Sequence, residues 1–172
     1  PWTSIISSMS SPTASRTAAT IRSADCISGS AISCHATPNG SNFMARIVRA
    51  ALLQAEWTGD KDSMIEMHEK YAREAAAQGA KVMCIQEVFY GPYFCQVQDP
   101  QYFSYTEHIP DGPTTKRMQE LARETGMVLI VPMYEEDDQT TGIYYNTAAV
   151  IDAAGSYLGK YRKTHIPHVK GF

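Results

Sequence analysis

The chain has 172 residues, a formal net charge of −3, 19% charged residues and 10% aromatic residues. These values are ordinary for a globular domain, and there is no basic excess of the kind that indicates nucleic acid or an anionic membrane surface as a partner. No apolar run approaches the roughly 20 residues that a membrane-spanning helix needs. The four cysteines show neither CxxC nor zinc-site spacing, so we expect unpaired thiols in a reducing compartment.

Residues 1–43 differ in composition from the rest of the chain. They are rich in Ser, Thr and Ala and have no apolar periodicity. Such a segment buries too little surface to offset the entropy of ordering, which predicts a disordered leader, or sequence upstream of a natural start at Met44. An organellar transit peptide is the alternative, because such peptides are rich in Ser and Arg and poor in acids. We expect a folded domain over 44–172 in a cytoplasmic protein.

The first half of this domain has a β–α–β pattern. Residues 47–54 and 82–87 are short apolar runs of strand length, and the second run ends in the carboxylate of Glu87. Between them, apolar residues recur at helical spacing. Asp60 or Asp62 suits the cap at the start of this helix, and Gly79 suits its end. This order predicts two parallel strands joined by a crossover helix.

The second half continues the α/β alternation. A long aromatic loop over 90–111 precedes a helix with Pro113 in its first turn and Gly126 at its end. Residues 127–133 predict a buried strand, and residues 144–152 and 157–161 alternate like the strands of a hairpin. The acidic run 135–138 is interpreted as a solvated hairpin tip rather than a cation site.

Glu87 is the first candidate for chemistry. It follows a predicted parallel strand, and active sites of α/β sheets gather at the carboxyl ends of such strands. Beside Phe89 and Tyr90 the carboxylate is expected to be partly desolvated, which would raise its pKa toward that of a useful general base. The alternative is a surface carboxylate that pairs with a neighbouring Lys or Arg.

Lys163 is the second candidate, in a basic cluster with Lys160 and Arg162 that follows an apolar run. A fixed ammonium there would stabilise an oxyanion, and the alternative is a solvated basic turn. His165 and His168 lie three positions apart with no nearby carboxylate, which is only a weak signal for a metal site. Cys95 is a candidate nucleophile beside Glu87, but it lies on a loop rather than at the end of a rigid element, which favours a packing or pocket-lining thiol. The absence of a Gly-rich phosphate loop argues against nucleotide binding.

Five short segments follow one another along the chain: IQEVFYGPYFC (85–95), IPDGPTT (109–115), VPMYE (131–135), YYNTAAVID (144–152) and GKYRKTHIPH (159–168). In this order they resemble the amino-terminal half of the nitrilase superfamily of carbon–nitrogen hydrolases. Any one of them is a weak signal, but five in the same order make a chance match unlikely. Within the superfamily, the residues around Glu87 and the final segment resemble the β-ureidopropionase branch, and N-carbamoylputrescine amidases are close relatives.

The resemblance implies an α/β fold, the incomplete amino-terminal half of an α-β-β-α sandwich, with a Glu–Lys–Cys triad. By residue, Glu87 would be the general base and Lys163 the oxyanion-stabilising cation, while the nucleophilic cysteine belongs to a motif that this chain does not contain. We expect Tyr90, Tyr93 and His165 to contact a small-molecule substrate. No metal or cofactor is expected, and relatives are usually homo-oligomers.

The implied reaction is hydrolysis of a non-peptide C–N bond, with N-carbamoyl-β-alanine as the first substrate and β-alanine, CO2 and ammonia as products. N-carbamoylputrescine or a simple aliphatic amide is the alternative substrate. Two other hypotheses stay open: a non-catalytic chain that associates with full-length relatives, and a lyase that uses Lys163 as a Schiff base. We expect the chain alone to be inactive and poorly stable, because one sheet face would remain uncovered.

Overall fold

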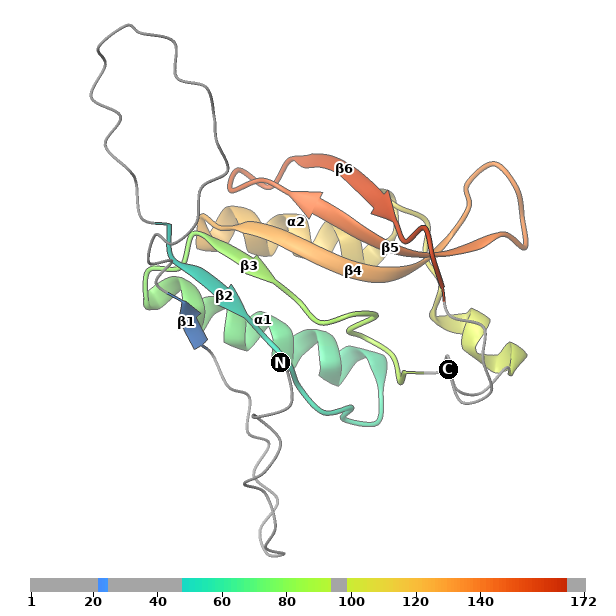
Figure 1. Cartoon of the computed structure of the whole chain (residues 1–172), viewed down its shortest axis with the longest axis horizontal. Coiled ribbons are helices and arrows are strands. Elements are labelled where there is room, and N and C mark those ends of the chain that lie inside the picture. Colours follow the sequence, from blue (N-terminus) through green and yellow to red (C-terminus); the bar gives the residue numbers. More distant parts are fainter. Residues whose placement is uncertain (1–21, 25–47, 94–98, 167–172) are drawn as a thin grey trace, which may run out of the picture.

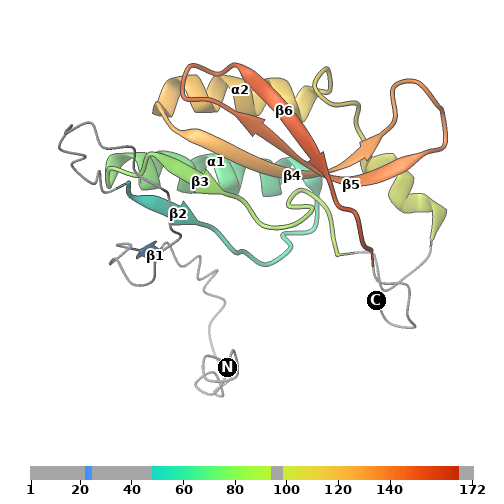
Figure 2. The ribbon, with the colours of Figure 1, turned by 45° about the horizontal axis from the view of Figure 1, so that its top comes forward.

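The structure, a computed structural model, describes residues 48–93 and 99–166 and the backbone of residues 22–24. Six strands form one sheet in the spatial order β1-β2-β3-β4-β5-β6. Figure 1 shows the helices α1 and α2 side by side behind this sheet, and Figure 2 shows the same layering from a second direction. The described residues therefore form one helix layer and one sheet layer, with the second sheet face free of helices.

The elements follow the predicted α/β alternation along the chain. They are β1 (Arg22–Ala24), β2 (Ala50–Leu52), α1 (Lys61–Ala77), β3 (Val82–Cys84), the 3-10 helix η2 (Pro100–Tyr105), α2 (Pro113–Thr125), β4 (Val128–Glu136), β5 (Tyr144–Ile151) and β6 (Tyr157–Arg162).

The pairing confirms the predicted β–α–β unit. Strands β2, β3 and β4 run parallel to one another, whereas β5 runs antiparallel to both β4 and β6. Strands β2 and β3 are each only three residues long, so both are shorter than the apolar runs that predicted them. Strand β1, which pairs antiparallel with β2, lies inside the segment 1–43 and was not predicted. The rest of that segment, with Cys26 and Cys34, lies outside the described residues.

The helix boundaries agree with the predicted capping residues. Asp60 caps α1, and its side chain accepts a hydrogen bond from the Ser63 amide at 2.9 Å. Pro113 opens α2, where its missing N–H removes no helical bond. Gly126 ends α2 in the left-handed conformation with φ +63°, a backbone state that glycine adopts without steric cost.

The core lies between the sheet and the two helices. Burial alternates along β4, which buries Leu129, Val131 and Met133 on the helix side. Ala72 of α1 and Met118 of α2 are fully buried and belong to the same core cluster. Among the described residues, no helix is long and apolar enough to cross a membrane.

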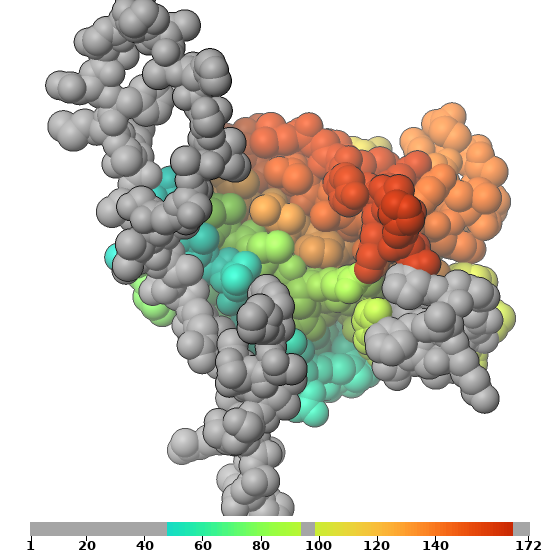
Figure 3. Space-filling model, viewed as in Figure 1, coloured from blue at the N-terminus to red at the C-terminus, as the bar shows by residue number. Residues whose placement is uncertain are grey.

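The opposite sheet face is open and partly apolar. Leu52 on β2 and Leu158 and Tyr161 on β6 are each at least 60% exposed. In the space-filling view of Figure 3, green, orange and red atoms of the segments that form β3 to β6 lie at the surface in the middle of this face. Exposed apolar sheet surface of this kind favours association, in keeping with the expectation that a further layer covers it.

His68 is the buried titratable residue of the helix layer. Its ring is fully buried on α1, 4.8 Å from the Phe89 ring, and Nδ1 lies 2.7 Å from the Met64 carbonyl oxygen. Nε2 has no hydrogen-bond partner among the described residues. Burial lowers the pKa of His68 because a charged imidazolium would be desolvated there, and the hydrogen bond to Met64 offsets only part of this effect.

His68 should therefore make the stability of the domain depend on pH. Below the unfolded-state pKa of about 6.5, the unfolded chain binds a proton that folded His68 resists, so the free energy of unfolding falls as the pH decreases. Urea unfolding at about pH 7.5 and about pH 5.5 should show this loss, and His68→Met should reduce it. An equal loss in the wild-type chain and in the variant would contradict this assignment.

Candidate active site

Glu87 lies in a short segment that continues β3 along the edge of β4. The Ile85 amide donates to the Ile130 carbonyl oxygen at 3.0 Å, and the Phe89 amide donates to the Pro132 carbonyl oxygen at 3.4 Å. Pro132 has no N–H to donate. It is tolerated inside the sheet because the bond to the segment after β3 uses the Phe89 amide as donor and the Pro132 carbonyl oxygen as acceptor. The turn that carries Glu87 is thus tied to β4 on both sides.

Two buried aromatic residues anchor the same segment in the core. Phe89 and Tyr90 are both fully buried, with ring centroids 5.2 Å apart. The Tyr90 hydroxyl donates to the Tyr134 carbonyl oxygen at 3.2 Å and lies 3.3 Å from the Tyr134 amide. Burial raises the pKa of Tyr90 well above its ordinary value, so this phenol stays neutral. Tyr90 was expected to contact the substrate, but in this conformation it is fully buried and packs in the core.

Val88, directly after Glu87, has a left-handed backbone with φ +48°. A β-branched residue in this region is a genuine outlier, with a cost on the order of 1–2 kcal/mol. Val88 is only 3% exposed, so packing holds the residue in place. Strained backbone of this kind clusters at functional sites, and here it lies beside the candidate base.

The structure brings Glu87 and Lys163 together, as predicted. Lys163 Nζ donates to Glu87 Oε1 at 2.7 Å, although the two residues are 76 positions apart in the sequence. Asn146 on β5, which sequence reasoning missed, donates from Nδ2 to the same oxygen, also at 2.7 Å. The side chains of Lys163 and Glu87 are 38% and 41% exposed, so a small molecule has access to them.

The expected direction of the Glu87 pKa shift is wrong. Partial burial does raise the pKa of the carboxyl group, and it is the largest single effect. The hydrogen bonds from Lys163 and Asn146, with the positive charge of Lys163, together outweigh it and leave the pKa below its ordinary value. Glu87 is therefore a carboxylate at neutral pH and is able to accept a proton.

The buried carboxylate of Glu135 determines which side of the sheet Lys163 faces. Glu135 on β4 is fully buried and accepts hydrogen bonds from Lys160 at 2.5 Å and from Arg162 at 2.6 Å, both on β6. Thr147 on the intervening β5 donates to the other oxygen at 2.6 Å. Because side chains alternate along a strand, holding Lys160 and Arg162 on the helix side turns the next residue, Lys163, to the open side.

Two interpretations from the sequence are corrected by this network. The run 135–138 is not a solvated tip throughout, because Glu135 is inside the protein and Arg162 also pairs with Asp137 at 3.0 Å. The basic cluster is not a solvated turn, because Lys160 and Arg162 are strand residues paired with a buried carboxylate. An acidic string alone does not reveal which of its members faces inward.

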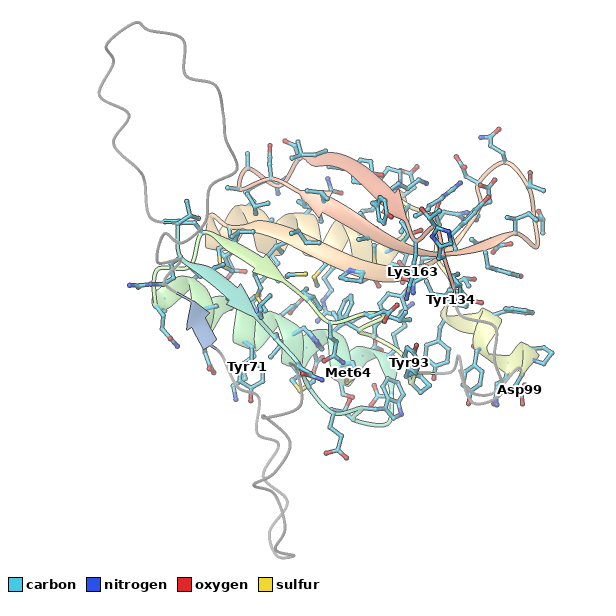
Figure 4. All side chains as sticks on the ribbon, viewed as in Figure 1. Met64, Tyr71, Tyr93, Asp99, Tyr134 and Lys163 are labelled. Atoms are coloured by element: carbon cyan, nitrogen blue, oxygen red, sulfur yellow. The ribbon has the colours of Figure 1, made fainter. Side chains whose placement is uncertain are left out.

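The remaining candidates are less well supported. Tyr93 and His165 are exposed, and Figure 4 shows Tyr93 and Lys163 in the same region of the molecule, with Tyr134 nearby. Whether Tyr93 and His165 contact a substrate stays a prediction. Cys95 and His168 lie outside the described residues. Within the described ranges, no group of three or more His, Cys, Asp or Glu side chains is arranged to hold a metal ion.

Comparison with known proteins assigns the chain to a family. Residues 49–172 match the model of the Carbon-nitrogen hydrolase family. An N-carbamoylputrescine amidase from Solanum lycopersicum is 42% identical over 127 residues, which are 74% of this chain and 41% of that protein. A Beta-ureidopropionase from Arabidopsis thaliana is 30% identical over 135 residues, which are 74% of this chain and 33% of that protein. The chain thus spans less than half the length of these relatives.

The fold agrees with this assignment. A carbon–nitrogen hydrolase from Helicobacter pylori G27 superposes with a TM-score of 0.65 at 30% identity and covers 73% of this chain and 42% of that chain. An amidase from Nesterenkonia sp. superposes with a TM-score of 0.54 at 20% identity, over 72% of this chain and 45% of that one. The predicted fold, the amino-terminal part of a nitrilase-type α/β sandwich, is confirmed.

Because the backbone at Val88 is strained, a glycine at this position should be more stable than an alanine, the reverse of the usual order. Glycine usually destabilises a position by roughly 0.5–1 kcal/mol relative to alanine, but at a positive φ the alanine Cβ is unfavourable. We expect Val88→Gly to unfold at a higher urea concentration than Val88→Ala, although both lose the buried side chain. If Val88→Ala is the more stable variant, the backbone at this position is not strained.

The buried network should be sensitive to the loss of its carboxylate. We expect Glu135→Leu to lower the free energy of unfolding by on the order of 3 kcal/mol, because it leaves Lys160 and Arg162 without their buried partner. Urea unfolding measures this loss. Glu124→Gln, which removes the carboxylate from the exposed pair with Arg73, is the matched control and should lower the free energy of unfolding far less. Equal losses would mean that Glu135 has no special role.

Proposed function

The chain belongs to the carbon–nitrogen hydrolase family, and from this premise we propose that it supplies the general base and the oxyanion-stabilising cation for hydrolysis of an N-carbamoyl compound. Glu87 is the base and Lys163 is the cation. The observation that carries the proposal is their contact of 2.7 Å at the edge of the sheet where the parallel strands end.

The chemistry requires a thiol nucleophile, which we expect from the part of the relatives that this chain does not match. The Glu87 carboxylate accepts the thiol proton, and the thiolate attacks the ureido carbonyl carbon. Lys163 then stabilises the negative charge on the tetrahedral oxyanion. The C–N bond to the terminal amino group breaks, and ammonia leaves with the proton that Glu87 returns. Water then hydrolyses the S-thiocarbamate to free the thiol and a carbamate, and the carbamate loses CO2 to give the amine product.

The substrate is proposed from the identities to the named relatives. The sequence motifs favour N-carbamoyl-β-alanine, whereas the N-carbamoylputrescine amidases are more similar to this chain, at 38–42% against 30% for the Beta-ureidopropionase. We therefore place N-carbamoylputrescine first and N-carbamoyl-β-alanine second. Both carry the same ureido group, so the roles of Glu87 and Lys163 are the same for either substrate.

Two chimeric enzymes test this function. Residues 49–172 replace the matching part of the Solanum lycopersicum N-carbamoylputrescine amidase in one chimera and of the Arabidopsis thaliana Beta-ureidopropionase in the other. We expect both chimeras to hydrolyse N-carbamoyl compounds. Glu87→Gln and Lys163→Ala should each lower kcat/KM by at least about 10²–10³-fold, because each removes a group that acts in the transition state.

Controls separate catalysis from folding and from substrate choice. Glu124→Gln removes an exposed carboxylate on α2 and should leave kcat/KM unchanged. If both chimeras prefer N-carbamoylputrescine, this half of the protein carries that preference. If folded chimeras retain full activity with Glu87→Gln or Lys163→Ala, the proposed function is wrong.

A further inference from the structure

Asn146 contacts both proposed catalytic residues, although the proposed reaction gives it no role. It lies on β5, where it pairs with Tyr134 of β4, and its carbonyl oxygen accepts the Lys163 amide at 2.8 Å. Its side chain donates to Glu87 Oε1 at 2.7 Å. One residue thus contacts Glu87 through its side chain and Lys163 through its backbone.

Asn146 and Lys163 both donate to the same oxygen of Glu87. Asn146 Nδ2 and Lys163 Nζ are both 2.7 Å from Oε1. Oε2 accepts no hydrogen bond within the described part of the chain, so it is the oxygen left to receive a proton. Two donors from different directions at Oε1 also restrict rotation of the carboxylate, which a single flexible lysine would not do.

The donors also differ in how they respond to the charge of Glu87. The ion pair with Lys163 weakens once Glu87 is protonated, because the carboxyl group is then neutral. A neutral amide still donates to Oε1 when the proton is on Oε2, so Asn146 holds the side chain in both states. The pairing of Asn146 with Tyr134 and the hydrogen bond from the Lys163 amide fix the backbone that carries this side chain.

We propose that Asn146 is a positioning residue, which holds Glu87 by Oε1 and leaves Oε2 free for proton transfer. The inference rests on the proposed function of Glu87 as a general base. Asn146 acts through Glu87 and takes no part in bond making itself. Its loss should therefore impair the proton-transfer step and leave substrate binding nearly unchanged.

The first test measures the carboxyl group directly and needs no catalysis. In the 172-residue chain labelled with ¹³C at the glutamate side chains, the Glu87 Cδ shift is followed with pH, and Glu87→Gln assigns the signal. Asn146→Ala should raise the pKa of Glu87, because a hydrogen bond that favours the carboxylate is lost. Asn146→Asp, of the same shape, should raise it further, since it places a like charge beside Glu87.

Thr147→Val is the matched control on the same strand. It removes the hydrogen bond of the neighbouring residue to Glu135, which lies on the other side of the sheet. It should lower the stability of the domain without moving the pKa of Glu87. If Asn146→Ala leaves this pKa in place, or if Thr147→Val moves it equally, the positioning role of Asn146 is wrong.

The second test uses the Solanum lycopersicum chimera. Asn146→Ala should lower kcat by roughly 10- to 100-fold with KM nearly unchanged, and should move the acidic limb of the kcat profile to higher pH. A rise in KM with kcat unchanged would instead mean a substrate contact and would overturn the proposal. Inactivity of the parent chimera would count against the proposed function, while the NMR titration would still decide the role of Asn146.

Discussion

The buried carboxylate of Glu135 is the constraint on which the arrangement of the site depends. It is fully enclosed on β4, and a carboxylate at that depth is stable only when it is paired and hydrogen-bonded. Lys160 and Arg162 of β6 supply the charges, and Thr147 of β5 supplies a further donor. A slip of β6 by one residue would turn both cations away from Glu135 and would turn Lys163 into the helix layer. The orientation of Lys163 toward Glu87 is thus coupled to the pairing of a buried charge on the other side of the sheet.

A second buried carboxylate fixes the long loop that precedes α2. Glu107 lies opposite Glu135 in a short parallel bridge and is only 7% exposed. Its side chain accepts the Thr114 amide at 2.9 Å and the Lys61 ammonium at 2.5 Å. Placed at the amino end of α2, it also complements the helix dipole. Glu107 and Glu135 are neighbours of like charge, and each is neutralised from a different side: one by α1 and α2, the other by β6.

Much of the framework follows from local sequence rules, and the site follows only in part. Asp60 and Gly126 mark helix ends because capping depends on the residue itself. Glu87 and Lys163 were predictable as partners only with the family resemblance, since each alone also suits a surface position. Asn146 and the burial of Glu135 depend on which residues face each other across β4, β5 and β6. The register shift between Val150 and Ile151 sets that pairing, and no local signal in the sequence specifies it.

The pKa of Glu87 shows why the site has to be considered with all its partners. In the resting structure the carboxylate is stabilised by Lys163 and Asn146, which makes it a weaker base than burial alone would give. In the proposed reaction, the ammonium of Lys163 turns to the developing oxyanion and neutralises Glu87 less. The thiol proton has already been accepted when the oxyanion develops, so the higher pKa of Glu87 helps to keep that proton on Glu87 until it passes to the leaving group. The amide of Asn146 keeps the carboxyl group in place throughout, because its hydrogen bond to Oε1 does not depend on the position of the Lys163 ammonium. The charged base of the resting site and the protonated acid that follows it are therefore compatible with one arrangement of three side chains.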